Sequence, residues 1–209
     1  MNEALRDHWN QAYLKRPVEE LGWYEDIPEP SIELVNKSLI TKDARVLISG
    51  AGASTLVDHL IRVGWTNIHV VDISDIALDL LKKRLGAKAD LVTFIQDDLL
   101  QPSVLIHEKP FELWIDRAVF HFFTQSDEQI AYHHLLNRMI KKDGALIMAS
   151  FAPGTAPKCS GLDVKHHDQE SLVEFLGEDY QLKESFENLY TQPSGNTRDF
   201  TYALFKKLI

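Results

Sequence analysis

The segment Val46-Leu47-Ile48-Ser49-Gly50-Ala51-Gly52-Ala53-Ser54 decides the fold of this chain. A β-branched apolar run ends in a pair of glycines, and a second apolar run, His69-Val70-Val71-Asp72, ends in a carboxylate twenty residues after Gly52. In open α/β sheets, such glycines let the backbone approach a ligand, and an acid at the tip of the second strand accepts hydrogen bonds from ribose hydroxyls. The sequence therefore predicts a nucleoside cofactor at this edge of a sheet.

The chain on either side of this segment alternates between short apolar runs and amphipathic stretches. The apolar runs predict five strands, at residues 46–49, 68–72, 91–96, 111–115 and 145–150. Helices are predicted between them, one ending at Gly64, one capped by Ser74 and ending at Gly86, and one with a Ser126–Gln129 capping box. A turn at residues 141–144 closes that last helix. A short helix follows Asp168 and ends at Gly177.

The last thirty residues follow a different pattern. Residues 180–190 and 199–207 alternate in polarity and are separated by Pro193-Ser194-Gly195-Asn196, which predicts an antiparallel hairpin. A dehydrogenase would instead repeat a second mononucleotide-binding half. The order of elements thus favours another class of nucleoside-binding α/β protein.

Composition limits the partners of the chain. Its 209 residues contain 44% hydrophobic and 25% charged residues, as in a globular protein with one substantial core. The net charge of −9 and the lack of a basic block argue against nucleic acid as a partner. No apolar run is long enough for a membrane span, residues 1–7 lack a signal-peptide core, and Cys159 is the single cysteine. We therefore expect a cytoplasmic protein without a disulfide, a membrane partner or a metal site.

These features together resemble the class I S-adenosylmethionine-dependent methyltransferases over nearly the whole chain. The resemblance implies an α/β, Rossmann-like, seven-stranded and mostly parallel sheet with helices on both faces and an antiparallel C-terminal strand. It divides a single domain into an N-terminal helical lid (1–40), a cofactor-binding core (41–150) and an acceptor-side loop, helix and hairpin (151–209). The cofactor implied is S-adenosylmethionine, the methyl donor.

The site residues implied by this resemblance lie at strand ends. Gly50, Gly52 and Ser54 match the glycine loop, Asp72 the ribose-binding acid, and Asp98 the acid that receives the adenine amino group, with Asp97 as an alternative one position earlier. Ile73 and Leu99 follow these acids and are expected to border the adenosine. Trp9 and Trp23 resemble the aromatic lid over the cofactor. Two positions depart from the family pattern, because Ile48 stands where an acid usually lies and Ser54 replaces the third glycine.

The fourth motif, Asp116-Arg117-Ala118-Val119-Phe120-His121-Phe122, is expected at the mouth of the site. We predict that Asp116 contacts the donor or acts in catalysis. His121 has two interpretations, a catalytic base and a histidine packed among phenylalanines. The Gly52-Ala53-Ser54 loop resembles the branch that methylates lysines of elongation factor and citrate synthase. That branch reads Asp-Lys-Gly-x-x-Asp, whereas Arg117, Ala118 and His121 stand here.

Four functions remain after this comparison. The first is methyl transfer to a small molecule, bound between the lid and the loops after the fourth and fifth strands, by a monomer or a homodimer. The second is methyl transfer to a protein lysine. The third is a nicotinamide-dependent oxidoreductase, and the fourth is a non-catalytic nucleoside-binding protein. The paired histidines 133–134 and 166–167 are predicted to lie on the surface and in a loop, respectively.

Overall fold

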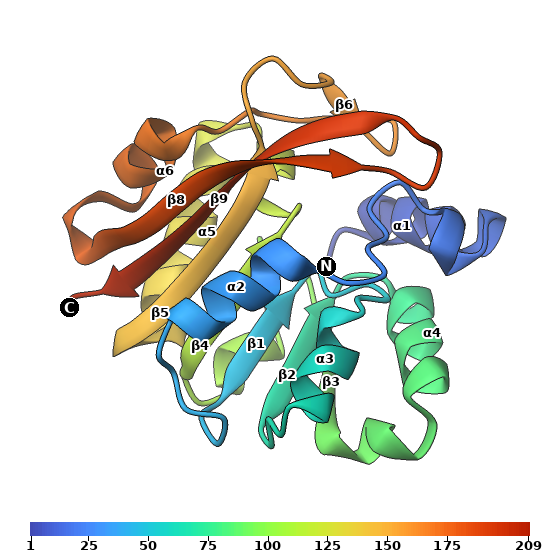
Figure 1. Cartoon of the computed structure of the whole chain (residues 1–209), viewed down its shortest axis with the longest axis horizontal. Helices are drawn as coiled ribbons and strands as arrows, with labels where there is room; N and C mark the ends of the chain where they lie inside the picture. The colour runs from blue at the N-terminus through green and yellow to red at the C-terminus, as the bar shows by residue number, and fades with distance from the viewer.

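A computed structural model describes all residues, 1–209, and shows an α/β fold built on one large sheet. The seven strands of this sheet lie in the order β3-β2-β1-β4-β5-β9-β8 (Figure 1). The strands are β1 (Val46–Ser49), β2 (Ile68–Asp72), β3 (Val92–Gln96), β4 (Phe111–Arg117), β5 (Ile140–Phe151), β8 (Tyr180–Thr191) and β9 (Thr197–Lys207). A separate two-stranded hairpin is formed by β6 (Lys158–Cys159) and β7 (Leu162–Asp163).

The first five strands are parallel, and β9 runs antiparallel to both β5 and β8. The hairpin predicted from the C-terminal alternation is therefore confirmed, and β9 is the reversed strand. The central strand β1 is fully buried because it pairs on both edges and is covered on both faces. The Rossmann-like architecture with an antiparallel C-terminal strand is the architecture that the sequence predicted.

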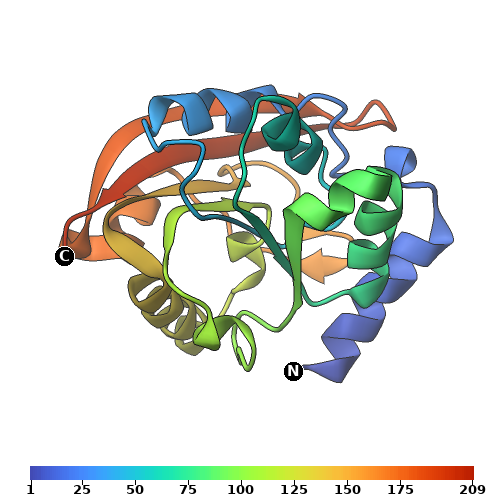
Figure 2. The ribbon, with the colours of Figure 1, turned by 90° about the horizontal axis from the view of Figure 1, so that it is seen from below.

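Helices cover both faces of the sheet, as Figure 2 shows in a view from below. One face packs against α2 (Glu29–Lys37), α3 (Leu56–Arg62) and α4 (Asp75–Leu85), and the other against α5 (Ser126–Met139) and α6 (Gln169–Leu176). The apolar side chains of each strand alternate between these two layers, with Ile48 on one and Leu47 on the other. The sheet is thus the middle of a three-layer molecule.

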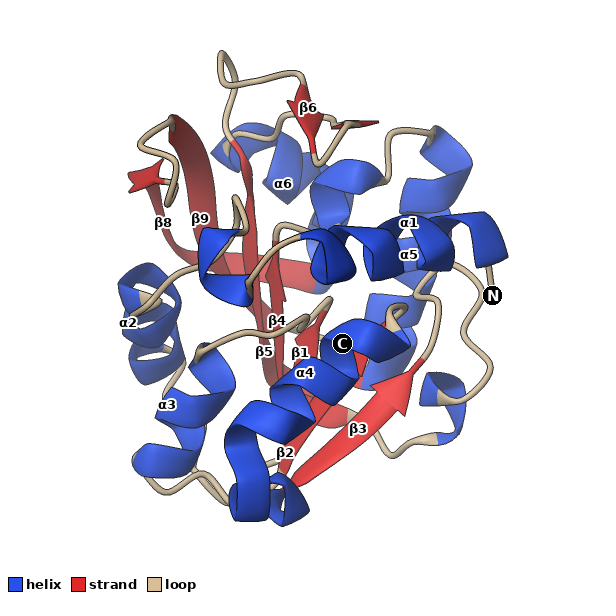
Figure 3. Cartoon of the chain, turned by 90° about the vertical axis from the view of Figure 1, so that its right-hand side faces the viewer, coloured by secondary structure: helices blue, strands red, loops and turns tan.

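The N-terminal helix α1 (Glu3–Lys15) lies outside these layers, beside α4 (Figure 3). Five short 3-10 segments complete the chain: Val18–Glu20, Gly86–Leu91, Leu105–His107, Phe120–Phe122 and Gly177–Asp179. No helix in the molecule has both the length and the apolar character that a bilayer crossing requires.

Three local predictions are wrong. Leu91 ends a 3-10 turn with half of its surface exposed and does not start a strand. The capping box before α5 joins Gln125 and Glu128, whose carboxylate accepts from the Gln125 N–H at 2.9 Å, so the box lies one residue earlier than expected. The segment 141–144 belongs to strand β5 and is not a separate turn. It forms a bulge there, because the pairing with β4 shifts register and Asp143 adopts φ +64°.

Candidate functional site

The loop after β1 requires both of its glycines. Gly50 and Gly52 have φ values of +53° and +50°, which side chains rarely adopt. A Cβ atom at Gly50 would lie 2.1 Å from a Val119 methyl carbon, and at Gly52 it would lie 2.0 Å from the Tyr13 hydroxyl oxygen. The loop is therefore held between the β4–α5 connection on one side and the N-terminal segment on the other.

Asp72 at the end of β2 ties this loop to the start of α4. Its Oδ2 accepts from the Gly52 N–H at 2.7 Å, and its Oδ1 accepts from the Ser74 N–H at 2.8 Å. The Ser74 hydroxyl in turn accepts from the Ala77 N–H, which caps α4 as predicted. Burial raises the pKa of Asp72 to about 6, although these backbone N–H groups oppose the shift. The carboxylate lies in the wall of a cavity, where its remaining lone pairs can accept hydroxyl protons.

The two adjacent acids after β3 have separate tasks. Asp97 holds the following loop through the N–H groups of Ser103, Val104 and Leu105, at 3.0, 2.8 and 2.8 Å. Asp98 accepts from the Asn2 N–H at 2.8 Å, which brings the N-terminus of α1 to the end of the sheet. Both acids border the same cavity as Asp72. Asp97 is thus committed to its loop, and Asp98 is the acid that meets the N-terminal segment.

The cavity beneath these groups has a volume of about 170 Å³. It extends from the acids after β2 and β3, across the glycine loop, to the ends of β1 and β4. Eight of the ten residues predicted to bind the cofactor line it: Trp9, Trp23, Gly50, Ser54, Asp72, Ile73, Asp98 and Leu99. Gly52 and Asp116 do not line it, although the Gly52 N–H donates to the lining residue Asp72 at 2.7 Å.

Aromatic side chains of the N-terminal segment wall in this cavity. The rings of Trp9 and Trp23 meet edge to face at 5.6 Å, and Trp9 also meets Phe122 at 5.2 Å. Trp23 donates from Nε1 to the Tyr13 hydroxyl at 3.1 Å. These four residues, Trp9, Tyr13, Trp23 and Phe122, are called the aromatic lid below. The packing of these rings explains why the volume of the cavity is smaller than the roughly 300–1,000 Å³ that is typical of ligand pockets.

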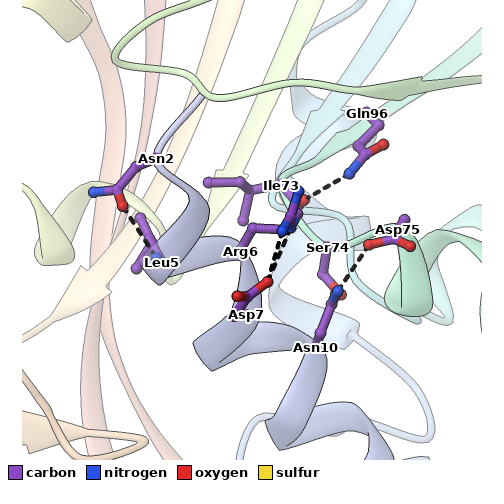
Figure 4. A network of polar contacts seen from close by, with 9 residues as sticks. All are labelled: Asn2, Leu5, Arg6, Asp7, Asn10, Ile73, Ser74, Asp75 and Gln96. Atoms are coloured by element: carbon purple, nitrogen blue, oxygen red, sulfur yellow. Dashed lines mark hydrogen bonds and ion pairs between the residues drawn. The ribbon is translucent and has the colours of Figure 1, made fainter.

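Polar contacts dock α1 onto the core beside this lid (Figure 4). The Asn10 side chain donates to Asp75 at 2.8 Å and accepts from the Ser74 hydroxyl at 2.6 Å. Gln96 donates to the Ile73 carbonyl at 3.3 Å, which fixes the chain between β2 and α4. The lid is therefore attached to the same turn that carries Asp72.

Asp116 lies behind the cavity wall. Its side chain is fully buried, its Oδ2 accepts from the Tyr132 hydroxyl at 2.6 Å, and its Oδ1 accepts from the Val119 and Phe120 N–H groups at 3.1 and 3.3 Å. Burial raises the pKa of Asp116 to about 6. Through these hydrogen bonds, Asp116 stabilises the turn after β4. The predicted contact of Asp116 with a ligand stays a prediction.

His121 is also fully buried and does not reach the cavity. It packs between Phe122 and Phe151, and its Nδ1 accepts from the Phe151 N–H at 3.3 Å. Burial lowers the pKa of His121 to about 3, with a further contribution from His167, so the ring is neutral and a poor proton acceptor at neutral pH. Of the two interpretations of His121, its position supports the packed one.

An ion pair that the sequence did not single out as part of the site lies in the cavity wall. Arg117, at the end of β4, is 2.9 Å from a Glu25 carboxylate oxygen, and both side chains are mostly buried, with 14% and 10% exposed. Arg117 also donates to the Tyr202 hydroxyl at 3.1 Å and to the Trp23 carbonyl at 3.2 Å. Burial raises the pKa of Glu25 even beside this cation. The pair therefore links the lid, the sheet and the C-terminal hairpin at one point.

The remaining candidates lie away from the cavity or are unreactive. His134 is exposed, His133 packs against Phe175, and no group of three or more metal-ligating side chains is present. Cys159 lines the cavity, and burial raises the pKa of its thiol to about 11, which keeps it protonated. The sequence signal for Arg117 was its departure from the family motif, and Glu25 directly follows the aromatic stretch Trp23-Tyr24 of the predicted lid.

Comparison with known proteins places this site in context. No protein-family model matches the chain. The mouse eEF1A lysine and N-terminal methyltransferase is 23% identical over 177 residues, which cover 85% of this chain, and the human protein is 20% identical over the same length. The chain spans about a quarter of the length of these curated relatives.

Solved structures resemble nearly the whole chain. A SAM-dependent methyltransferase from Anabaena variabilis matches with a TM-score of 0.74 and 17% identity, covering 97% of this chain and 95% of its own. The 1,6-didemethyltoxoflavin-N1-methyltransferase from Burkholderia thailandensis, solved with bound 1,6-didemethyltoxoflavin and S-adenosylhomocysteine, matches with a TM-score of 0.73 and 17% identity, covering 99% of this chain and 88% of its own. The N-methyltransferase NodS from Bradyrhizobium japonicum matches with a TM-score of 0.69, 17% identity, and coverage of 96% and 99%. The chain thus has the fold of the class I S-adenosylmethionine-dependent methyltransferases.

Proposed function

We propose that this protein is an S-adenosylmethionine-dependent methyltransferase that acts on a small molecule. One observation carries the proposal: a single cavity joins the positive-φ loop at Gly50, the buried strand-end acid Asp72, and the aromatic lid. A ribose diol suits Asp72, an adenine amino group suits Asp98, and apolar Ile73 and Leu99 suit the faces of an adenosine. The residues present therefore fit the donor.

When bound, S-adenosylmethionine supplies an electrophilic methyl group on a sulfonium. The protein then needs to hold a nucleophile in line with that methyl group and to exclude water. The glycine loop lets the backbone approach the donor, and the aromatic lid shields the reacting atoms. The two residues predicted to be catalytic, His121 and Asp116, do not line the cavity. The carboxylates that do line it are already engaged, Glu25 by Arg117 and the strand-end acids by backbone N–H groups. Positioning is therefore the main contribution of this chain, and it suits an acceptor that is nucleophilic without strong activation.

A small acceptor is favoured by the way the lid closes the cavity. The aromatic lid and the Glu25–Arg117 pair cover the cavity from the N-terminal side. Among the similar structures, the Burkholderia enzyme was solved with a small heterocycle and NodS is named an N-methyltransferase. These resemblances support a small molecule as the acceptor.

Methylation of a protein lysine is the second candidate, and the sequence similarity to the eEF1A lysine and N-terminal methyltransferases favours it. Two features of the structure disfavour this candidate. Arg117 stands where the lysine-methylating branch has lysine, and its guanidinium forms an ion pair with Glu25. His121 stands where that branch has its second acid, but its side chain is fully buried and cannot take over that role. A methylation assay on protein extracts and on isolated acceptors distinguishes the two candidates.

The test of the donor is calorimetric titration with S-adenosylmethionine and, separately, with S-adenosylhomocysteine. Micromolar binding of both is the expected result. Binding of NADH, with no heat from either S-adenosyl compound, would instead indicate an oxidoreductase. Donor binding without methyl transfer to any acceptor in a broad screen would indicate a nucleoside-binding protein without catalysis.

We also propose that the protein works in the cytoplasm, because its one cysteine suits a reducing compartment. It acts as a monomer or a homodimer under this proposal. Light scattering during size-exclusion chromatography measures the mass directly, and 23.9 kDa is the value for one chain.

A further inference from the structure

A second cavity adjoins the first one. It has a volume of about 620 Å³ and lies between α1, the loop 21–23, the β6–β7 hairpin and the tip of the β8–β9 hairpin. These elements surround the same corner of the molecule in Figure 1. Trp23 and Cys159 line both cavities, so these two side chains form the boundary between them. The volume of this second cavity, called the outer groove below, is within the range of small-molecule sites.

The charge of the outer groove is opposite to that of the whole protein. The chain has 31 acidic and 22 basic residues, whereas four cations and one carboxylate line the groove. The cations come from three separate elements: Lys15 and Arg16 from α1 and its end, Lys158 from β6 and Arg198 from β9. The tertiary fold therefore collects positive charge here that no single stretch of sequence contains.

Most of these cationic side chains have no acidic partner within the protein. Lys158 pairs with Asp163 at 3.1 Å, and both side chains are exposed. The single lining carboxylate, Asp7, bonds to Arg6 at 2.8 Å and so does not neutralise the groove. Arg16 and Arg198 have no ion pair. The position of Lys15 is explained by the helix dipole, which a cation in the last turn of α1 stabilises. Arg198 lies on a strand, so no helix dipole explains its position.

The lining changes from charged to apolar toward the first cavity. Trp23 and the buried Phe151 lie with Cys159 near the boundary, and Gln192 and Ser160 add neutral hydrogen-bonding groups. Gln192 donates to the Gly22 carbonyl at 2.7 Å, which fixes the hairpin tip against the lid loop. A ligand that follows this gradient would have an anionic end at the cations and a flat or apolar body against Trp23.

We propose that the outer groove binds the methyl acceptor and that this acceptor is a small anion, with a carboxylate or phosphate group remote from the atom that is methylated. This inference rests on the proposed methyltransferase function, because the first cavity must hold the donor. The cations hold the anionic group through charge-assisted hydrogen bonds. The rest of the acceptor then passes between Trp23 and Cys159 toward the donor.

The test uses benzoate, phenyl phosphate and the neutral benzamide as probes, with binding followed by tryptophan fluorescence and calorimetry at saturating S-adenosylhomocysteine. Both anions are expected to bind, and benzamide is expected to bind about tenfold more weakly. The stronger of the two anions identifies the carboxylate or phosphate preference. Binding of benzamide as tight as that of benzoate, or no binding of either anion at millimolar concentration, would overturn the proposal.

Variants then locate the probe. The double substitution Arg16→Gln/Arg198→Gln is expected to weaken anion binding about tenfold, since each of these two cations contributes part of that factor. The matched control Lys83→Gln/Lys88→Gln removes two exposed cations from the α4 side, away from the groove, and is expected to change nothing. Equal binding by the two double variants would refute the location. Both should bind S-adenosylhomocysteine as wild type does, and a wild-type protein that does not bind it refutes the proposed function separately, because probe binding can also be measured without it.

Discussion

The two ends of the first cavity are formed by different kinds of interaction. At the end formed by β1 and β2, short-range sequence patterns and the structure agree: glycines adopt positive φ, Asp72 ends its strand, and Ser74 caps the next helix. At the end formed by β4 and the N-terminal segment, the family motif is altered, and an Arg117–Glu25 pair and an aromatic lid shape the wall. The comparison shows that local sequence patterns describe the first end, whereas contacts between distant segments shape the second.

The largest effect is expected from Asp72→Asn at the first end. The amide cannot accept from two ribose hydroxyls and two backbone N–H groups together, so donor affinity should fall about 100-fold. Calorimetric titration with S-adenosylhomocysteine measures it, with the exposed Asp79→Asn on α4 as the charge control. Asp116→Asn is a second comparison: a small loss of affinity fits its position behind the wall, whereas a loss as large as that of Asp72→Asn would restore its predicted contact with the donor.

At the second end, Glu25→Gln leaves the mostly buried Arg117 cation without its charge partner. We expect a loss of about 2 kcal/mol in the free energy of unfolding, below the roughly 3–5 kcal/mol for fully buried pairs, because both groups keep some solvent contact. Urea denaturation measures this loss. Glu33→Gln breaks the exposed pair with Lys37 and should produce no measurable change. Equal stability of the two variants would show that the second end does not depend on its ion pair.

The pH dependence of donor binding separates the two ends further. Because burial raises the pKa of Asp72 to about 6, a proton occupies the carboxylate below that pH and competes with the ribose hydroxyls. Donor affinity should therefore fall as the pH drops through 6, by about tenfold at pH 5, one unit below the pKa. Titrations between pH 5 and 8 measure it. In Asp72→Asn this dependence should disappear, and its persistence would assign it to another group.

The smallest effect is expected at Ala118. This residue has φ +65°, and the lysine-methylating branch that the chain resembles has glycine at this position. Ala118→Gly should leave donor binding unchanged and should change stability by no more than about 1 kcal/mol, because relief of the left-handed conformation is offset by greater freedom of the unfolded chain. Thermal unfolding and the same calorimetric titration are sufficient. A large loss of donor affinity would mean that the Ala118 methyl group contacts the ligand.

Local patterns determined much of the architecture. The order of strands and helices, the glycine loop, the Ser74 cap and the C-terminal hairpin all depend on hydrogen bonds and torsion angles within a few residues, so they can be recognised in the sequence. The errors arose where two elements meet. The extra length of β5 through residues 141–144 comes from pairing with β4 across a bulge, and no local signal encodes that pairing.

The sequence by itself determined the fold class, the glycine loop with its strand-end acids, and eight of the residues that line the first cavity. Only the tertiary structure placed Asp116 and His121 behind the cavity wall, paired Glu25 with Arg117 across 92 positions of chain, and gathered the four cations of the outer groove from three elements. The physical reason is the distance along the chain between the groups that interact. Backbone conformation and strand-end motifs are set by neighbours in sequence, whereas burial, ion pairing and electrostatic potential depend on groups that only the completed fold brings together.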